Sequence, residues 1–148
     1  MSAAWLAPSW RKPLFWGVAV GIFQAFSPLA FWWLTPVIVW SLALAFIAAV
    51  YIGFAIADGR LVVIAAEIAV ASAFLILATL AVKSVWLGVI ALAAHGVKDA
   101  WQHRTEFVAN TRWWPPFCLV VDFVAATLIA VLLLAGGSGE GPLLPLWR

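Results

Sequence analysis

The chain has 148 residues, of which 67% are hydrophobic and only 9% are charged, and its net charge is +2. A soluble globular domain carries about 25% charged and about half apolar residues, so the composition excludes that class and predicts a membrane protein. The single cysteine, Cys118, excludes an intrachain disulfide and a cysteine-based zinc site. The small net charge gives no reason to expect nucleic acid as a partner.

The first long apolar run covers residues 14–57. As one helix it would measure ~66 Å, about twice the ~30 Å bilayer core, so it must fold back once. Pro28 and Pro36 offer the two breaks, because proline disfavours helix in the residue before it. The break at Pro36 gives spans of similar length and predicts helices over 14–34 and 36–57, with Pro28 as a kink inside the first.

Turn signals divide the remaining sequence. Asp58-Gly59-Arg60 predicts a turn, Lys83-Ser84 ends the third helix, and Pro115-Pro116 opens the last one. We therefore expect an all-α, polytopic membrane helix bundle in one domain, 1–148. Its transmembrane helices are 14–34, 36–57, 61–82, 85–103 and 116–135, between a short N-terminal segment 1–13 and an irregular tail 136–148. Gly17 and Gly21 form a GxxxG motif, which predicts a helix-packing face.

Basic residues indicate the orientation. With five crossings, one side of the membrane receives six of them and the other side receives Lys83 and Arg148; the six are Arg11, Lys12, Arg60, Lys98, Arg104 and Arg112. Positively charged loops stay in the cytoplasm. The sequence therefore predicts a protein of the cell inner (plasma) membrane, with its N-terminus in the cytoplasm and its C-terminus outside.

The stretch HGVKDAWQHR, 95–104, contains both histidines of the chain. At ~100° per residue, five polar side chains of this region share one arc of ~100°; they are His95, Asp99, Gln102, His103 and Glu106. Such a stripe must face other helices or a wet cavity. Lys98 lies beside it, and we expect its side chain to snorkel to the lipid headgroups.

Two further acids lie at a matching depth. Glu67 is six residues into the third helix and Asp122 six into the fifth, so both lie ~9 Å deep, close to the level of His95. Imidazole and carboxylate ligands suit Zn, Fe or Mn, so His95, Asp99, Glu67, Asp122 and His103 are the candidate metal ligands. His95 and His103 are ~12 Å apart along the axis and do not share one ion unless the helix breaks.

Three other interpretations stay open for these groups. His95 could ligate a haem or chlorin, or the acids and histidines could relay protons. The acids could also pair with Lys and Arg and simply hold the helices in register. Trp113 and Trp114 in TRWWPPF are candidate cofactor-binding residues near the mouth of the cluster, and an interfacial anchor is the alternative role.

The segments YIGFAIADGR (51–60) and HGVKDAWQHRTEFVANTRWWPPFCLVVD (95–122) resemble a group of small bacterial membrane proteins known only as a domain of unknown function. The resemblance covers roughly residues 45–130 and implies no activity. From the residues we expect an accessory or structural subunit of a membrane assembly, with the lipid bilayer and other subunits or a second copy as partners. The alternatives are an intramembrane metal or cofactor enzyme acting on a lipid-like substrate, or a proton- or ion-handling protein.

Overall fold

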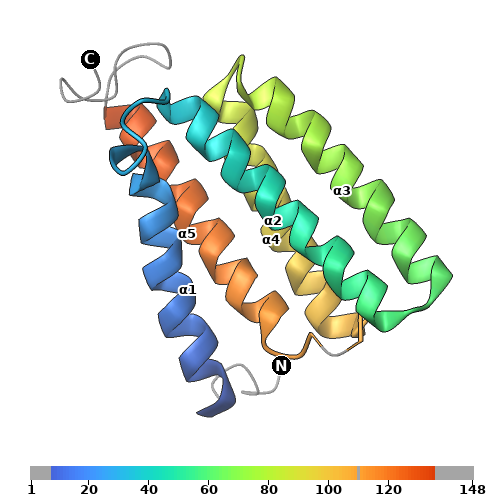
Figure 1. Cartoon of the computed structure of the whole chain (residues 1–148). Helices are drawn as coiled ribbons and strands as arrows, with labels where there is room; N and C mark the ends of the chain where they lie inside the picture. The colour runs from blue at the N-terminus through green and yellow to red at the C-terminus, as the bar shows by residue number, and fades with distance from the viewer. Residues whose placement is uncertain (1–7, 110, 136–148) are drawn as a thin grey trace.

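The computed structural model describes residues 8–109 and 111–135, and they form an all-α bundle without strands (Figure 1). The elements are α1 (Pro8–Phe26), the 3-10 helix η2 (Ser27–Leu29), α2 (Pro36–Asp58), α3 (Leu61–Ala81), α4 (Val85–Thr105) and α5 (Trp114–Ala135). The expectation of an all-α helix bundle is confirmed. The predicted irregular tail 136–148 lies outside the described residues.

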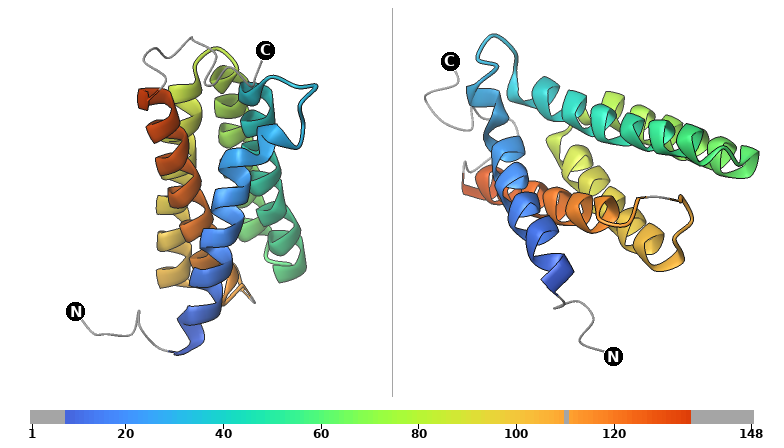
Figure 2. Two further views of the ribbon diagram at one scale, coloured as in Figure 1. Left: turned by 90° about the vertical axis from the view of Figure 1, so that its left-hand side faces the viewer. Right: turned by 60° about the horizontal axis from the view of Figure 1, so that its bottom comes forward.

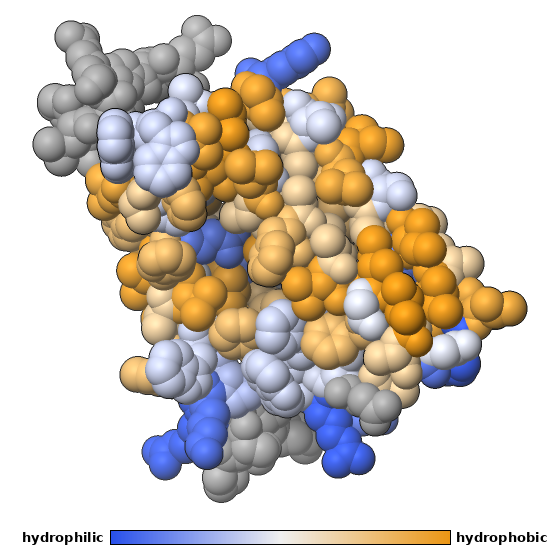
Figure 3. Space-filling view, in the orientation of Figure 1, coloured by the Kyte–Doolittle hydropathy of each residue, from blue (hydrophilic) through white to orange (hydrophobic). Residues whose placement is uncertain are grey.

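Three of the described helices, α2, α3 and α5, are long and apolar enough to cross a membrane. α1 has Arg11 and Lys12 in its first turns, and α4 carries the polar stripe, so neither reaches the same hydropathy. Apolar side chains cover most of the middle of the face in Figure 3, while hydrophilic residues gather toward the ends of the bundle. A membrane helical bundle is supported to this extent.

The helices form a continuous series of neighbours. α1 packs on α5, α5 on α4, α4 on α3 and α3 on α2. Figure 2 shows α1 and α5 on one side of the bundle and α2 with α3 on the other. α4 is therefore packed between α5 and α3, and its polar stripe has a neighbour on each flank.

The first helix differs from the predicted span 14–34. It begins at Pro8, ends at Phe26, and is followed by the 3-10 turn that contains Pro28. Proline lacks an N–H and disfavours helix before it, so Pro28 ends the helix instead of kinking it. The buried Trp40 indole Nε1 donates to the carbonyl of Ala25 over 3.0 Å and ties this helix end to α2.

The other helix ends follow the predicted signals. α2 begins at Pro36, and proline is tolerated there because a backbone N–H in the first turn, which proline lacks, would have no acceptor within the helix. Gly59 ends α2 with a left-handed φ of 80°, a conformation that glycine adopts without strain. Glu106 takes φ 49° after α4, so the helix stops one residue before the last member of the predicted stripe.

The GxxxG motif packs α1 against α5. A Cβ atom added at Gly17 would lie 2.7 Å from the Val120 Cβ, and one at Gly21 would lie 2.8 Å from the Val124 Cβ. Real Cβ atoms essentially never approach other atoms this closely. The two glycines therefore let the helix backbones approach, and the predicted packing face is confirmed.

An ion pair joins the two connections at one end of the bundle. Asp58 accepts from the Arg60 guanidinium at 2.6 and 2.8 Å and from the Ala109 amide at 2.7 Å, while Arg60 donates to the Phe107 carbonyl. The Asp58 carboxylate raises the pKa of Arg60. The turn after α2 and the loop after α4 are thus held together, at the end where α1 and α5 begin (Figure 1).

Candidate metal centre

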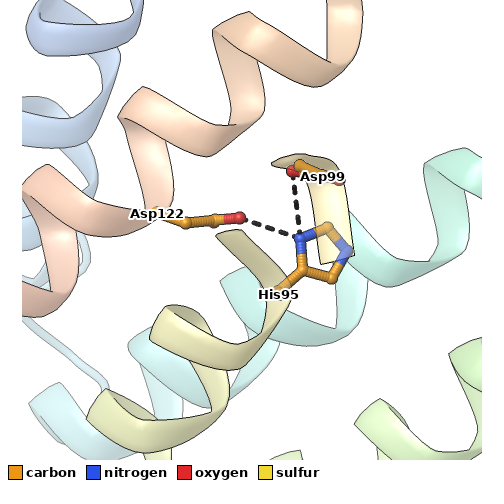
Figure 4. Close-up of side chains that lie close together, drawn as sticks. All are labelled: His95, Asp99 and Asp122. Atoms are coloured by element: carbon orange, nitrogen blue, oxygen red, sulfur yellow. Dashed lines mark hydrogen bonds and ion pairs between the residues drawn. The ribbon is translucent and has the colours of Figure 1, made fainter. Parts of the chain in front are cut away.

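Three side chains converge between α4 and α5. The His95 Nδ1 lies 2.8 Å from the Asp122 Oδ2 and 3.4 Å from the Asp99 Oδ2 (Figure 4). One ligand atom from each residue lies within 4.8 Å of the other two. The exposed fractions of His95, Asp99 and Asp122 are 1%, 0% and 0%, so water does not reach the group from the surface.

The helices bring these residues together for simple geometric reasons. His95 and Asp99 are four apart on α4 and therefore share a face. Gly96, beside His95, allows α5 to come close, because a Cβ there would lie 3.0 Å from the Phe123 ring and 3.4 Å from the Asp122 Cβ. Asp122 thus reaches His95 across a short helix–helix distance.

Aromatic rings from two other helices enclose the imidazole. The Phe74 ring of α3 lies 4.8 Å from the His95 ring in an edge-on arrangement, and the Tyr51 ring of α2 lies 5.6 Å from it. A haem or chlorin on His95 would have to displace both rings. The surroundings therefore fit a small ion at Nδ1 and do not fit a macrocycle.

Several buried oxygen atoms around the imidazole lack a hydrogen-bond donor. Both carboxylate oxygens of Asp99 and Oδ1 of Asp122 are buried without a hydrogen-bond partner, and the Tyr51 hydroxyl, itself a donor, interacts with Asp99. Buried polar atoms are nearly always hydrogen-bonded, and an exception points to a bound ion or water. Two carboxylates and one imidazole therefore form a centre in which three carboxylate oxygens have no hydrogen bond.

A second polar group lies between α3 and α4. Glu67 Oε2 accepts from the Lys98 ammonium at 2.8 Å, and its Oε1 accepts from the Gln102 amide. The Lys98 Nζ also lies over the Tyr51 ring, 3.2 Å from its centre. Tyr51 thus contacts both groups, and Lys98 does not snorkel to the headgroups as expected.

The two groups divide the sequence-predicted ligands. His95, Asp99 and Asp122 come together, whereas Glu67 is bonded to Lys98 and Gln102. His103 lies apart, where it lines a polar pocket of about 370 Å³ beside Gln102, Glu106 and Arg112. Trp113 and Trp114 line a groove between α1 and α5.

Sequence reasoning missed two residues of this region. Tyr51 is fully buried between the two polar groups, and its signal is that it is the only tyrosine of the chain. Cys118 lies one turn before Asp122 on α5 and interacts electrostatically with Asp99 and Asp122, whereas the sequence was used only to exclude a disulfide and a cysteine-based zinc site. Its spacing of four residues from Asp122 was the available signal.

The distances between the three ligand atoms are close to those of a metal coordination shell. Bonds of about 2.0–2.2 Å in a tetrahedral zinc site place neighbouring ligand atoms roughly 3.3–3.6 Å apart. The Nδ1–Asp99 distance of 3.4 Å lies in this range, and the Nδ1–Asp122 distance of 2.8 Å is somewhat shorter. Small side-chain shifts would therefore bring all three atoms onto one ion.

Comparison with family models, with curated proteins and with solved structures finds no match to this chain. The chemistry of the centre therefore has to be inferred from its own side chains.

Proposed function

We propose that this chain is a small integral membrane protein that binds one divalent transition-metal ion between α4 and α5, with His95, Asp99 and Asp122 as ligands. The observation that carries the proposal is the set of three buried carboxylate oxygens of Asp99 and Asp122 that have no hydrogen-bond partner beside the imidazole. An ion would accept electron pairs from the two carboxylates and from Nδ1. The carboxylate oxygens would then have a partner in the bound ion.

Charge supports a divalent ion. As metal ligands, two ionised carboxylates and a neutral imidazole together carry −2, and the Lys98 ammonium is already bonded to Glu67. Burying uncompensated charge in a bilayer is costly. A dication neutralises the centre, and the mixture of one imidazole nitrogen with carboxylate oxygens suits Zn, Mn or Fe.

Burial supports a resident ion. Catalytic metal sites keep a coordination position open to substrate, whereas structural sites are closed. The three ligands are at most 1% exposed, and rings from α2 and α3 cover the imidazole. We therefore favour a closed site over an intramembrane enzyme acting on a lipid-like substrate.

The membrane topology forms part of the proposal. All five helices cross the bilayer, with the N-terminus in the cytoplasm of a bacterial cell and the C-terminus outside the inner membrane. In support, the described basic residues Arg11, Lys12, Arg60, Arg104 and Arg112 lie near one end of the bundle, and Lys83 lies in the turn at the other.

Metal content tests the binding of an ion. We expect the gently purified protein to carry one metal ion per chain by elemental mass spectrometry. His95→Ala and Asp122→Asn should lower the affinity by more than about 100-fold, since losing even a hydrogen-bond partner of a ligand weakens binding 10- to 100-fold. His103→Ala, which removes the other histidine, is the matched control and should retain the metal.

A wild-type protein that takes up no Zn, Mn or Fe(II) would overturn the proposal, as would full metal retention in His95→Ala. That result would favour the second candidate, an accessory or structural subunit whose polar groups only join helices. The bonds His95–Asp122 and Glu67–Lys98 favour this role, because they link α4 to α5 and to α3. A proton-handling role would instead require proton flux in liposomes that His95→Ala abolishes.

A further inference from the structure

A groove of about 540 Å³ separates the N-terminal parts of α1 and α5. Lys12 lies at its edge. The walls are largely aromatic, with Trp16 and Val20 from α1, Trp113 just before α5, and Trp114 and Phe117 from the first turn of α5. The Trp16 and Trp113 side chains are more than half exposed. The groove therefore opens on the outer surface of the bundle, away from the buried metal centre.

Ring-to-ring contacts hold the α5 wall of the groove. The Trp114 ring lies 5.1 Å from Trp113, 5.4 Å from Phe117 and 5.5 Å from Phe54 of α2. The Trp114 indole Nε1 is buried and donates to no acceptor. A ligand in this groove would therefore meet a preformed apolar wall.

Charge selects the kind of ligand. Aromatic walls attract quaternary ammonium groups, but the Lys12 ammonium repels them. Lys12 is exposed, and Arg11 beside it adds a second positive charge. Tryptophan and lysine together at a bilayer interface are the residues that contact lipid headgroups and upper acyl chains. The groove has positive charge at its edge and apolar walls along its length. A lipid with an anionic headgroup and an apolar acyl chain matches this arrangement.

We propose that the groove binds one anionic phospholipid, with its phosphate near Lys12 and one acyl chain along Trp16, Val20 and Phe117. With the N-terminus of the chain in the cytoplasm, the site would lie in the leaflet that is rich in anionic lipid. The inference does not depend on the metal centre, which involves none of these side chains.

Native mass spectrometry in detergent tests the site with phosphatidylglycerol and phosphatidylcholine of identical acyl chains. We expect the wild-type protein to retain roughly fivefold more phosphatidylglycerol, from one lysine near the headgroup. Lys12→Gln should remove this preference, and Val20→Trp, which fills the groove, should reduce retention of both lipids. Lys83→Gln, at the other end of the bundle, is the matched control and should keep the preference.

Equal retention of the two lipids by the wild-type protein would overturn the proposal. So would an unchanged preference in Lys12→Gln, or an equal loss of preference in Lys83→Gln, because the latter would indicate attraction by overall charge instead of a site.

Discussion

Glu67→Leu is expected to destabilise the protein by about 3–5 kcal/mol, because it removes the partner of a buried charge. The Lys98 side chain is only 12% exposed in the wild-type protein, and its ammonium would lose its only carboxylate contact among the described residues. The Gln102 amide would lose its acceptor in the same variant. Thermal unfolding in detergent, followed by circular dichroism, measures the change in the free energy of unfolding.

The double variant Glu67→Leu with Lys98→Met separates the effect of leaving the Lys98 charge unpaired from the other effects of replacing Glu67. Replacing both members of a buried ion pair with apolar residues is often neutral or stabilising, so we expect the double variant to recover most of the lost stability. Lys83→Met, which changes a cation in the turn at the opposite end, is the control and should have little effect. Equal destabilisation by the single and the double variant would contradict the ion-pair explanation.

Gly21→Leu is expected to separate α1 from α5. The added Cβ would lie 2.8 Å from the Val124 Cβ and 2.9 Å from the Val121 carbonyl oxygen, which is part of the backbone and has no room to move. Overpacking of this kind typically destabilises by about 1–3 kcal/mol. We expect a lower unfolding temperature and faster proteolysis of α1 in detergent.

Gly53 on α2 provides the matched control for this change. A Cβ there meets nothing within 4 Å, so Gly53→Leu adds the same side chain to another long apolar helix without a clash. We expect wild-type stability and proteolysis. If both variants behaved alike, the close approach of α1 and α5 at Gly21 would not be the reason for the loss.

The sequence predicts most of the helix bounds because short signals interrupt long apolar runs. The observed α2, α3, α4 and α5 begin and end within two residues of their predictions, at Pro36, at the turn around Gly59 and at Pro115-Pro116. The first helix is the exception. Pro28 and Pro36 both interrupt it, and equal span length was the wrong criterion, since the helix ends at the first proline and the next begins at the second.

Part of the site was predictable from spacing alone. His95 and Asp99 share a helix face whatever surrounds them, so their proximity follows from the sequence. The partners on other helices do not, because spacing within one helix does not fix the rotation of its neighbours. The sequence predicts matching depths for Glu67 and Asp122, but α3 packs on the flank that carries Lys98 and Gln102, whereas α5 packs on the flank with Asp99.

Lys98 is a second residue whose contacts with other helices do not follow from the sequence. An isolated lysine near the end of a membrane helix is expected to extend to the headgroups. Here α3 places Glu67 within 2.8 Å of its ammonium, and α2 places the Tyr51 ring beneath it. A charged partner inside the bundle therefore competes with the lipid surface, and only the packing of three helices reveals it.

X-ray absorption spectroscopy at the edge of the bound metal tests the proposed centre most directly. We predict nitrogen and oxygen ligands at about 2.0–2.2 Å, with the outer-shell scattering of a single imidazole, and no sulfur at about 2.3 Å. The imidazole signal should vanish in any metal that His95→Ala still binds. A sulfur ligand from Cys118, a shell without imidazole or a protein that binds no metal would contradict the assignment of His95, Asp99 and Asp122.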